Sequence, residues 1–197
     1  AFHKPRGIEC TANPNVKKNV ISYINYPIRI YYIGRLDKDS EGLLLLTNQG
    51  ELVNKMMRSG NQHEKEYVVT VNKPVTKEFI KKMQDGVPIL GTKTRKCRVI
   101  QTGEKSFRII LTQGLNRQIR RMCQYLGYEV KRLKRIRVMN IELGDLPVGS
   151  YREVTAQEMK TLQEMIKDSS ETTVIKKERG KKCEPDRKNE GTRRIVK

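Results

Sequence analysis

The sequence has 197 residues, 36% of them hydrophobic, and its 41 Lys and Arg residues exceed its 22 Asp and Glu residues to give a net charge of +19. One globular domain with an extension is expected at this length. Because neither a run of 18 apolar residues nor a signal-peptide pattern is present, we predict no membrane span and no export. The charge favours a polyanionic partner, because each phosphate that Lys or Arg neutralises releases counterions and adds affinity; a basic surface without a specific partner is the alternative.

The N-terminal part of the chain is predicted to contain short strands and helices. We expect strands at 2–3, 8–11, 30–33 and 43–46, and helices at 16–24 and 50–57. The strands at 30–33 and 43–46 flank a connection, residues 34–42, in which glycine and charge interrupt the apolar runs. The chain begins at Ala1 without a methionine, and we interpret it as an excised domain that lacks an N-terminal portion.

The rest of the folded part is predicted to be richer in strands. We expect strands at 66–71, 96–101, 107–112, 129–138 and 139–143, and helices at 76–83, at 116–126 and from Thr155 onward. The helix at 116–126 has the clearest pattern, because four apolar residues follow the i, i+3, i+4, i+7 spacing of one face: Ile119, Met122, Cys123 and Leu126. Gly127 is placed to end it. Thr155 and Glu158 have the spacing of a capping box.

These elements predict an α+β fold. Strands and helices mingle without strict β-α alternation, which indicates a mixed, mostly antiparallel central sheet with flanking helices. We assign residues 1–168 to one folded domain. Residues 169–197 contain ten basic and five acidic residues and few large apolar ones, so they cannot bury enough surface to offset chain entropy, and we expect a basic, disordered tail.

The four cysteines do not have the spacing of a metal site. Cys10, Cys97, Cys123 and Cys183 are separated by 87, 26 and 60 positions, and no Cys-x-x-Cys occurs. Scattered thiols without a secretory signal fit a reducing cytoplasm, which is the location we expect. Cys123 falls on the apolar face of its helix, and we interpret it as a core residue.

Asp37 is the first candidate for chemistry, because it follows Arg-Leu on an irregular connection between two buried strands. A buried carboxylate must find an opposite charge or take up a proton. Arg120, on the flank of the helix at 116–126, is the candidate partner. A turn-capping role for Asp37 and a purely structural ion pair are the alternatives, and Asp39, followed by Ser40, is the better candidate for local capping.

The other candidate residues are those that could bind a polyanionic partner. Residues 108–137 hold nine Lys and Arg against one Glu, a net charge of +8 in a segment that also looks folded. Arg117 and Arg121 lie on the polar face of the predicted helix. Tyr67 lies at the start of a strand, where a tyrosine can belong to the core with its hydroxyl at the rim. Alternatively, its ring can stack on a base, an interaction worth about 1–3 kcal/mol. The sequence pattern alone does not distinguish these two roles.

Residues 34–48 read Gly-Arg-Leu-Asp-Lys-Asp-Ser-Glu-Gly-Leu-Leu-Leu-Leu-Thr-Asn. This stretch resembles the signature of bacterial ribosomal RNA pseudouridine synthases of the small-subunit synthase A branch. Further stretches resemble that family's motifs in the same order, over about residues 2 to 166: residues 3–7, 65–67, 114–122 and 146–152. Residues 60–67 and 86–92 look most like a large-subunit member of the family.

The resemblance implies a pseudouridine synthase fold with a catalytic cleft in residues 1–168. It makes Asp37 the catalytic aspartate, which attacks the target uridine at the base or the ribose. Tyr67 would stack on the flipped base and assist removal of the proton at C5, and Arg120 would pair with Asp37. Arg35 would fill the space that the flipped nucleotide leaves or hold the RNA backbone. Lys65, Arg117 and Arg121 are the further residues expected to bind RNA.

The resemblance also implies the partners. Large-subunit ribosomal RNA is the expected substrate, and a transfer RNA anticodon loop is an alternative. A non-catalytic RNA-binding or ribosome-assembly module is the alternative of a different class. We expect no metal and no organic cofactor, because the reaction is an isomerisation without redox change, and we expect a monomer without membrane contact. Full-length relatives of this branch begin with a small RNA-binding domain like that of ribosomal protein S4, which this sequence does not contain.

Overall fold

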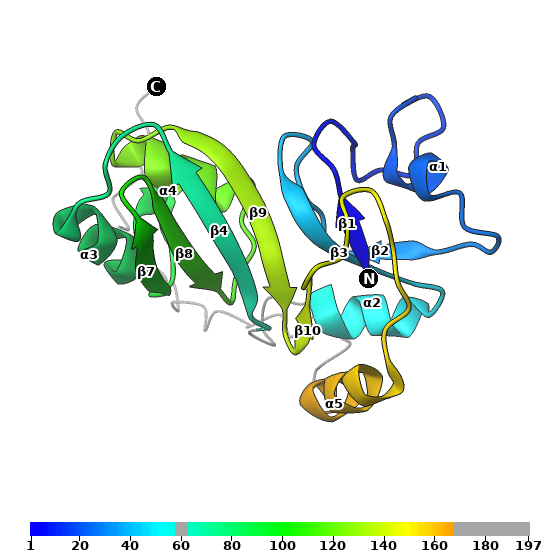
Figure 1. Cartoon of the computed structure of the whole chain (residues 1–197). Helices are drawn as coiled ribbons and strands as arrows, with labels where there is room; N and C mark the ends of the chain where they lie inside the picture. Colours follow the sequence, from blue (N-terminus) through cyan, green and yellow to red (C-terminus); the bar gives the residue numbers. More distant parts are fainter. Residues whose placement is uncertain (58–62, 168–197) are drawn as a thin grey trace, which may run out of the picture.

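The structure is a computed structural model that describes residues 1–57 and 63–167 (Figure 1). The tail at 169–197 with Cys183, and residues 60–62 of the stretch at 60–67, lie outside the described residues. The predicted α+β class is confirmed, because an eight-stranded mixed sheet is flanked by helices. Among the described residues no helix is long and apolar enough to cross a membrane.

The helices and strands have the following bounds. The strands are β1 (Phe2–Lys4), β2 (Tyr31–Ile33), β3 (Glu41–Thr47), β4 (Lys65–Val71), β5 (Pro88–Ile89), β6 (Thr92–Lys93), β7 (Arg98–Gly103), β8 (Ser106–Leu111), β9 (Val130–Val138) and β10 (Ile141–Glu142). The helices are α1 (Val20–Ile24), α2 (Gly50–Met57), α3 (Lys77–Asp85), α4 (Gln118–Tyr125) and α5 (Ala156–Ile166).

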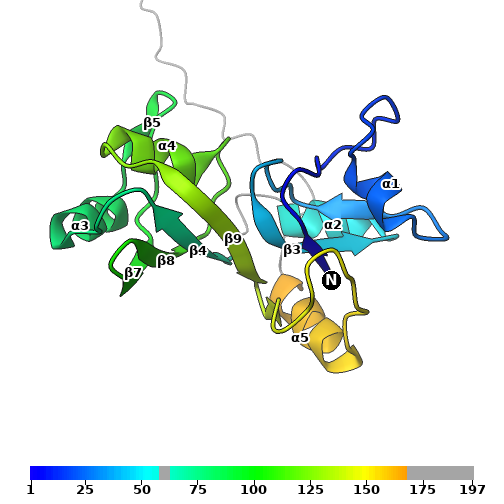
Figure 2. The same ribbon diagram turned by 45° about the horizontal axis from the view of Figure 1, so that its top comes forward.

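The main sheet has the order β1-β3-β9-β4-β8-β7, with β2 on β3 and β10 on β9. Of the strands in the described residues, only β3 and β9 pair in parallel, and this contact joins the two halves of the sheet (Figure 1). It requires Gly42, because a Cβ atom there would collide with the backbone of Arg135. Figure 2 shows α1 and α2 beside β3 in one half and α3 and α4 beside β4 and β8 in the other.

Each half has its own apolar core. Val69, Phe79, Phe107 and Met122 belong to the core that lies between β4, β8 and β9 and the helices α3 and α4. A second core lies between β3, β10, α2 and α5. A third, smaller cluster contains Phe2, Leu36 and Leu44. The apolar stripe predicted for α4 is confirmed, because three of its residues are at most 5% exposed and the fourth is partly buried: Ile119, Met122, Cys123 and Leu126.

Two predictions near the N-terminus are wrong. Residues 8–11 do not form a strand, since only Glu9 makes an isolated bridge, to Asn19. The helix predicted at 16–24 begins at Val20, because Asn19 caps it: its Oδ1 accepts a hydrogen bond from the backbone N of Ser22 at 2.8 Å. The hairpin of β5 and β6 was not predicted. The capping box of Thr155 and Glu158 is confirmed.

Candidate active site

The connection between β2 and β3 presents Asp37 at the rim of the smaller apolar cluster. Leu36 is 6% exposed and anchors the connection, and its backbone N donates to Sγ of Cys10 at 3.4 Å. The backbone N of Ser40 donates to the carbonyl of Asp37 at 3.1 Å and closes the turn. The side chain of Asp37 therefore remains 31% exposed, half-buried beside a buried anchor.

Helix α4 brings two arginines to this carboxylate. Arg117, the N-cap residue in the left-handed conformation, places Nη1 3.4 Å from Oδ2 of Asp37. Arg120, one turn further, places Nε 4.0 Å from the same oxygen. Neither carboxylate oxygen of Asp37 accepts a hydrogen bond from a described residue, so these two longer ion pairs are its contacts to α4. The predicted pair of Asp37 and Arg120 is thus brought together, but as a long contact to one oxygen.

Asp39 is the residue that fastens α4 to the connection. Its Oδ1 and Oδ2 accept hydrogen bonds from Nη1 and Nη2 of Arg117 at 3.1 and 3.0 Å, and Nη2 of Arg120 lies 3.3 Å from Oδ2. Burial alone would raise the pKa of Asp39, but the hydrogen bonds from Arg117 and the charge of Arg120 hold it below its ordinary value. The local backbone bonding expected of Asp39 is present in part, because its own backbone N–H also lowers the pKa of the carboxyl, but the two guanidinium groups offer stronger, charge-assisted bonds.

Arg120 is held on three sides. Its Nη1 donates to the carbonyl of Val130 at 3.2 Å, and its Nη2 donates to the carbonyl of Asp39 at 3.1 Å and to Oγ of Ser40 at 3.3 Å. The side chain is 14% exposed. Its Nε is buried without a hydrogen-bond partner among the described residues. These contacts fix the guanidinium with Nε near Asp37, whose carboxylate can act as a nucleophile or a base.

Two buried cations lie behind the aspartates, and neither was predicted. Lys4 is 0% exposed and donates from Nζ to the carbonyl of Ser40 at 2.9 Å; burial lowers its pKa, while the charges of Cys10 and then of Asp37 act in the opposite direction. Arg135 is 1% exposed, and its Nε donates to the carbonyl of Leu43 at 2.7 Å. A fully buried lysine and arginine are uncommon, and their positions depend on the pairing of β1 and β9 with β3, which local sequence patterns do not reveal.

Tyr67 and Lys65 lie on β4, beside this group. Tyr67 faces Arg135 across the β4–β9 pair and packs against the cluster that contains Leu36, so its half-buried ring is near the Asp37 connection. Lys65 begins β4 and donates from Nζ to the carbonyl of His63 at 3.2 Å. Burial, and then the charge of Arg135, lowers the pKa of Lys65 to about 8.

The other predicted RNA-binding residues are placed differently. Arg117, expected to face phosphate, is instead bound to the two aspartates, although its side chain remains 41% exposed. Arg121 donates to the carbonyl and to Oδ1 of Asn116, both at 3.1 Å, and stands apart from the aspartates. Arg35 is exposed, and its carbonyl accepts a 3.5 Å hydrogen bond from Arg135.

An open hollow of about 530 Å³ adjoins the aspartates. It is lined by Arg6, Gly7, Lys38, Asp39 and Arg117. Arg6 comes from the connection between β1 and α1, Lys38 from the connection between β2 and β3, and Arg117 from the start of α4. The two halves of the sheet therefore contribute to one basic surface. Such a surface can bind phosphate next to a carboxylate that would otherwise repel it.

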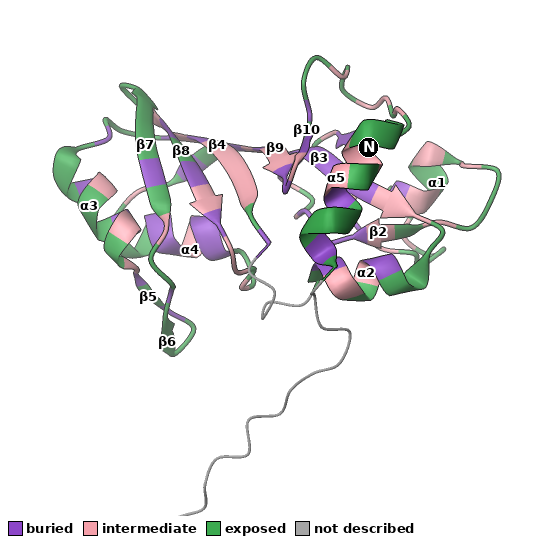
Figure 3. Cartoon of the chain, turned by 90° about the horizontal axis from the view of Figure 1, so that it is seen from below, coloured by how far each residue is buried: buried purple, intermediate pink, exposed green. Residues whose placement is uncertain are grey.

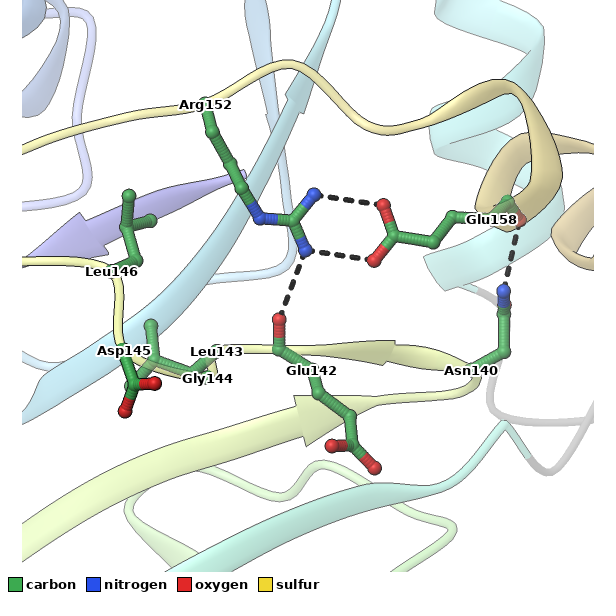
Figure 4. Close-up of a pocket in the computed structure, with 8 residues that line it drawn as sticks. All are labelled: Asn140, Glu142, Leu143, Gly144, Asp145, Leu146, Arg152 and Glu158. Atoms are coloured by element: carbon green, nitrogen blue, oxygen red, sulfur yellow. Dashed lines mark hydrogen bonds and ion pairs between the residues drawn. The ribbon is translucent and has the colours of Figure 1, made fainter.

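A second hollow, of about 460 Å³, lies between β10 and the start of α5 (Figure 4). Figure 4 shows Arg152 and Glu158 on the wall of this hollow, paired side by side. Nη1 and Nη2 of Arg152 donate to Oε2 and Oε1 of Glu158 at 2.8 and 2.7 Å. Arg152 also donates to the carbonyl of Glu142 at 3.2 Å, and Asn140 donates to the carbonyl of Glu158 at 2.9 Å. These contacts attach α5 to β10. Within residues 1–57 and 63–167, no group of three or more His, Cys, Asp or Glu has the arrangement of a metal site.

Comparison with known proteins shows which family and which relatives the chain is similar to. Residues 1–125 match the family described as RNA pseudouridylate synthase. The chain is 54% identical over 170 residues to the dual-specificity RNA pseudouridine synthase RluF of Escherichia coli (strain K12), a match that covers 86% of this chain and 59% of that protein. It is 37% identical over 170 residues to ribosomal large subunit pseudouridine synthase B of Bacillus subtilis (strain 168), with 82% of this chain and 70% of that protein covered.

A solved structure supports the fold. A crystal structure of a pseudouridylate synthase superimposes with a TM-score of 0.76 at 28% sequence identity, over 82% of this chain and 71% of that chain. The chain spans 59% of the length of the RluF relative. Parts of that relative therefore have no counterpart among the residues described above.

Proposed function

The chain belongs to the RNA pseudouridylate synthase family, as its motif at 34–48 predicted, and from this premise we propose that it isomerises a uridine of large-subunit ribosomal RNA to pseudouridine. The relative named ribosomal large subunit pseudouridine synthase B supports this substrate. In the proposed assignment residues 1–168 are the catalytic domain, and the chain acts as a monomer.

The reaction exchanges one bond to the ribose for another. The bond from C1′ to N1 of uracil breaks, the detached base rotates, and a bond from C1′ to C5 forms; C5 loses a proton and N1 ends with one, so no electrons are gained or lost. Asp37 is the proposed nucleophile, at the ribose or at the base. Its carboxylate accepts no hydrogen bond from a described residue, and the ion pairs recorded with both arginines are to Oδ2, which leaves the carboxylate able to react with the substrate.

Arg120 and Tyr67 are proposed to complete the catalytic group. The positive charge of Arg120 attracts and orients the carboxylate of Asp37, and the three contacts that hold its guanidinium limit its movement. A uridine must leave its stack before its glycosidic bond is accessible, at a cost of a few kcal/mol. The half-buried ring of Tyr67 offers that base a stacking surface.

Binding of the surrounding RNA is assigned to cationic residues. Arg35, Lys65, Arg117 and Arg121 are the proposed contacts, together with the basic hollow beside Asp39. Phosphate contacts from these side chains would offset the cost of base flipping. A purely RNA-binding module would gain nothing from two carboxylates beside its cationic surface, because they repel phosphate. The single observation that carries the enzymatic proposal is therefore the half-exposed Asp37, held between Arg117 and Arg120.

The experiment is to map carbodiimide-reactive pseudouridines in ribosomal RNA from cells with and without this protein. Loss of one large-subunit site, restored by the unchanged chain but not by an Asp37→Asn variant, is the expected result. A second substrate class is tested in parallel, because the RluF relative is named dual-specificity: transfer RNA from the same cells is mapped for anticodon-loop sites. An unchanged map in both RNAs would contradict the proposal.

A further inference from the structure

Within the described part of the chain, the sheet formed by β7, β8, β4 and β9 has one face that no helix covers. Alternate side chains, among them Val69, Phe107 and Ile109, point toward α3 and α4 and are fully buried. The intervening positions point the other way, and Figure 1 shows α4 behind these strands with no helix in front of them. β7 is exposed except for Val99, which is the one buried band on that strand in Figure 3.

The register of the strands places cations together on this open face. Glu66 of β4 pairs with Ile110 and Arg137, Val68 with Arg108 and Lys134, and Thr70 with Ser106 and Arg132. On the outer strand Arg98 pairs with Ile110, and Ile100 with Arg108. The open face therefore has five cationic residues to one acidic residue: Arg98, Arg108, Arg132, Lys134 and Arg137, with Glu66.

Ion pairs use only part of this charge. Glu66 lies 2.9 Å from Arg137 and 3.5 Å from Arg108. Glu64, which also lines this side of the sheet, lies 2.9 Å from Arg137, and Arg132 pairs with Glu41 at the edge of the face. Among residues 1–57 and 63–167, Arg98 and Lys134 have no acidic partner within 4.0 Å. An excess of positive charge on a well-ordered surface raises the local concentration of polyanions.

The open face is hollowed and has an aliphatic centre. A depression of about 690 Å³ is lined in part by Arg98, Ile100, Arg108 and Ile110, and Ile100 is 40% exposed. None of the eleven side chains that the register places on this face is aromatic, so it offers no aromatic ring on which bases could stack. Arginines without aromatic partners suit phosphate and sugar contacts, which position RNA without reading its sequence.

We propose that this open face binds the backbone of a second segment of the RNA substrate, separate from the segment that carries the target uridine. Tyr67 and Arg135 lie at positions on β4 and β9 that alternate with the open face and point toward the opposite side, so one short stem-loop cannot contact both. A large folded RNA can present a second helix there. This inference rests on the proposed function for the identity of the polyanion.

The test uses the full chain and the variant Arg98→Gln with Lys134→Gln, two exposed or half-buried residues that have no ion pair to lose. Equilibrium binding is measured over a range of salt concentrations with two RNAs: a large-subunit ribosomal RNA and a short stem-loop containing the target uridine. We expect the affinity for the long RNA to fall several-fold and its salt slope to decrease by about 1 per side chain removed. Turnover of the stem-loop should be unchanged.

A matched control removes the same charge elsewhere. Lys77→Gln with Lys81→Gln changes two exposed lysines on α3, and we expect it to leave both the affinity and the slope unaltered. Equal effects of the two double variants, or no effect of the first, would overturn the proposal. So would a dimer of the unchanged chain in sedimentation that dissociates in the Arg98 and Lys134 variant. Failure of the proposed function would be recognised separately from failure of this inference, because the unchanged chain would then show no turnover of the stem-loop.

Discussion

Nε of Arg120 lies 4.0 Å from Oδ2 of Asp37 and is buried without a hydrogen-bond partner among the described residues. That separation is too long for a hydrogen bond, although both Nη atoms of the same guanidinium make hydrogen bonds. The arginine is therefore positioned by other groups, and its interaction with Asp37 is electrostatic.

Asp37→Asn should lower turnover by about 10³-fold or more while RNA affinity stays nearly constant. The amide keeps the size of the side chain but removes the charge and most of the nucleophilicity that the carboxylate supplies. Single-turnover kinetics with a saturating stem-loop RNA measure the effect, and a binding titration measures affinity. Asp145→Asn, at an exposed acidic residue in the other hollow, is the control. Substantial turnover by Asp37→Asn would remove this residue from the mechanism.

Asp39→Ala should lower kcat by about 10 to 100-fold with a smaller change in KM, because Asp39 positions Arg117 and Arg120. Asp39→Asn retains an oxygen acceptor and should fall between the alanine variant and the unchanged chain. Thermal unfolding separates positioning from loss of stability. Glu9→Gln removes a nearby exposed carboxylate that pairs with Lys38 and should leave kcat unchanged. A parallel loss in the Glu9 variant would point to net charge instead of positioning.

Tyr67→Leu and Tyr67→Phe should separate stacking from the hydroxyl group. The leucine variant loses the ring, so we expect a loss of about 1–3 kcal/mol in transition-state stabilisation. The phenylalanine variant keeps the stacking surface, and a lower kcat at unchanged KM is expected if the hydroxyl assists proton removal. Both values come from steady-state kinetics on the stem-loop RNA. Full activity of the leucine variant would show that Tyr67 has only a packing role, in the apolar cluster that it contacts.

Arg117→Ala with Arg121→Ala should weaken RNA binding and decrease the salt slope by up to about 2. Among the described residues, the side-chain hydrogen bonds of Arg121 go to Asn116 and it has no ion pair, so its guanidinium can be released to a phosphate without loss of an ion pair. Arg117 is bound to Asp39 and Asp37, so the single variant Arg117→Ala should also lower kcat. Filter binding from low to high salt gives the slope, and an unchanged slope would show that α4 does not contact phosphate.

The sequence was sufficient to predict those parts of the fold whose pattern is local. The stripe on α4 and the capping box of α5 depend on residues three or four positions apart, and both are present as predicted. The strand predicted at 8–11 failed because apolar composition does not show whether a partner strand is available. Among the described residues, 8–11 make only the isolated bridge from Glu9 to Asn19.

The candidate site was predictable only in part. Asp37 and Arg120 were paired from the sequence, and the structure brings them together. The role of Asp39 was missed, because the bonds it makes to α4 join residues 78 positions apart. Lys4 and Arg135 were missed for the same reason: each is buried by the pairing of a distant strand with β3. A motif in one segment does not contain that information.

Glu158→Gln should reduce the free energy of unfolding by about 1 kcal/mol at pH 7, with a difference that disappears in acid. Hydrogen bonds from Arg152 lower the pKa of Glu158 from 4.5 to about 2 in the folded chain, so the stabilisation is complete above the unfolded value of 4.5 and is lost as the pH falls from there toward 2. Glutamine can still cap the backbone of Thr155, which isolates the charge. Urea unfolding at several pH values measures the effect, with Glu164→Gln, exposed on the same helix, as the control. A difference that is constant down to pH 3 would show that the pair with Arg152 contributes nothing to stability.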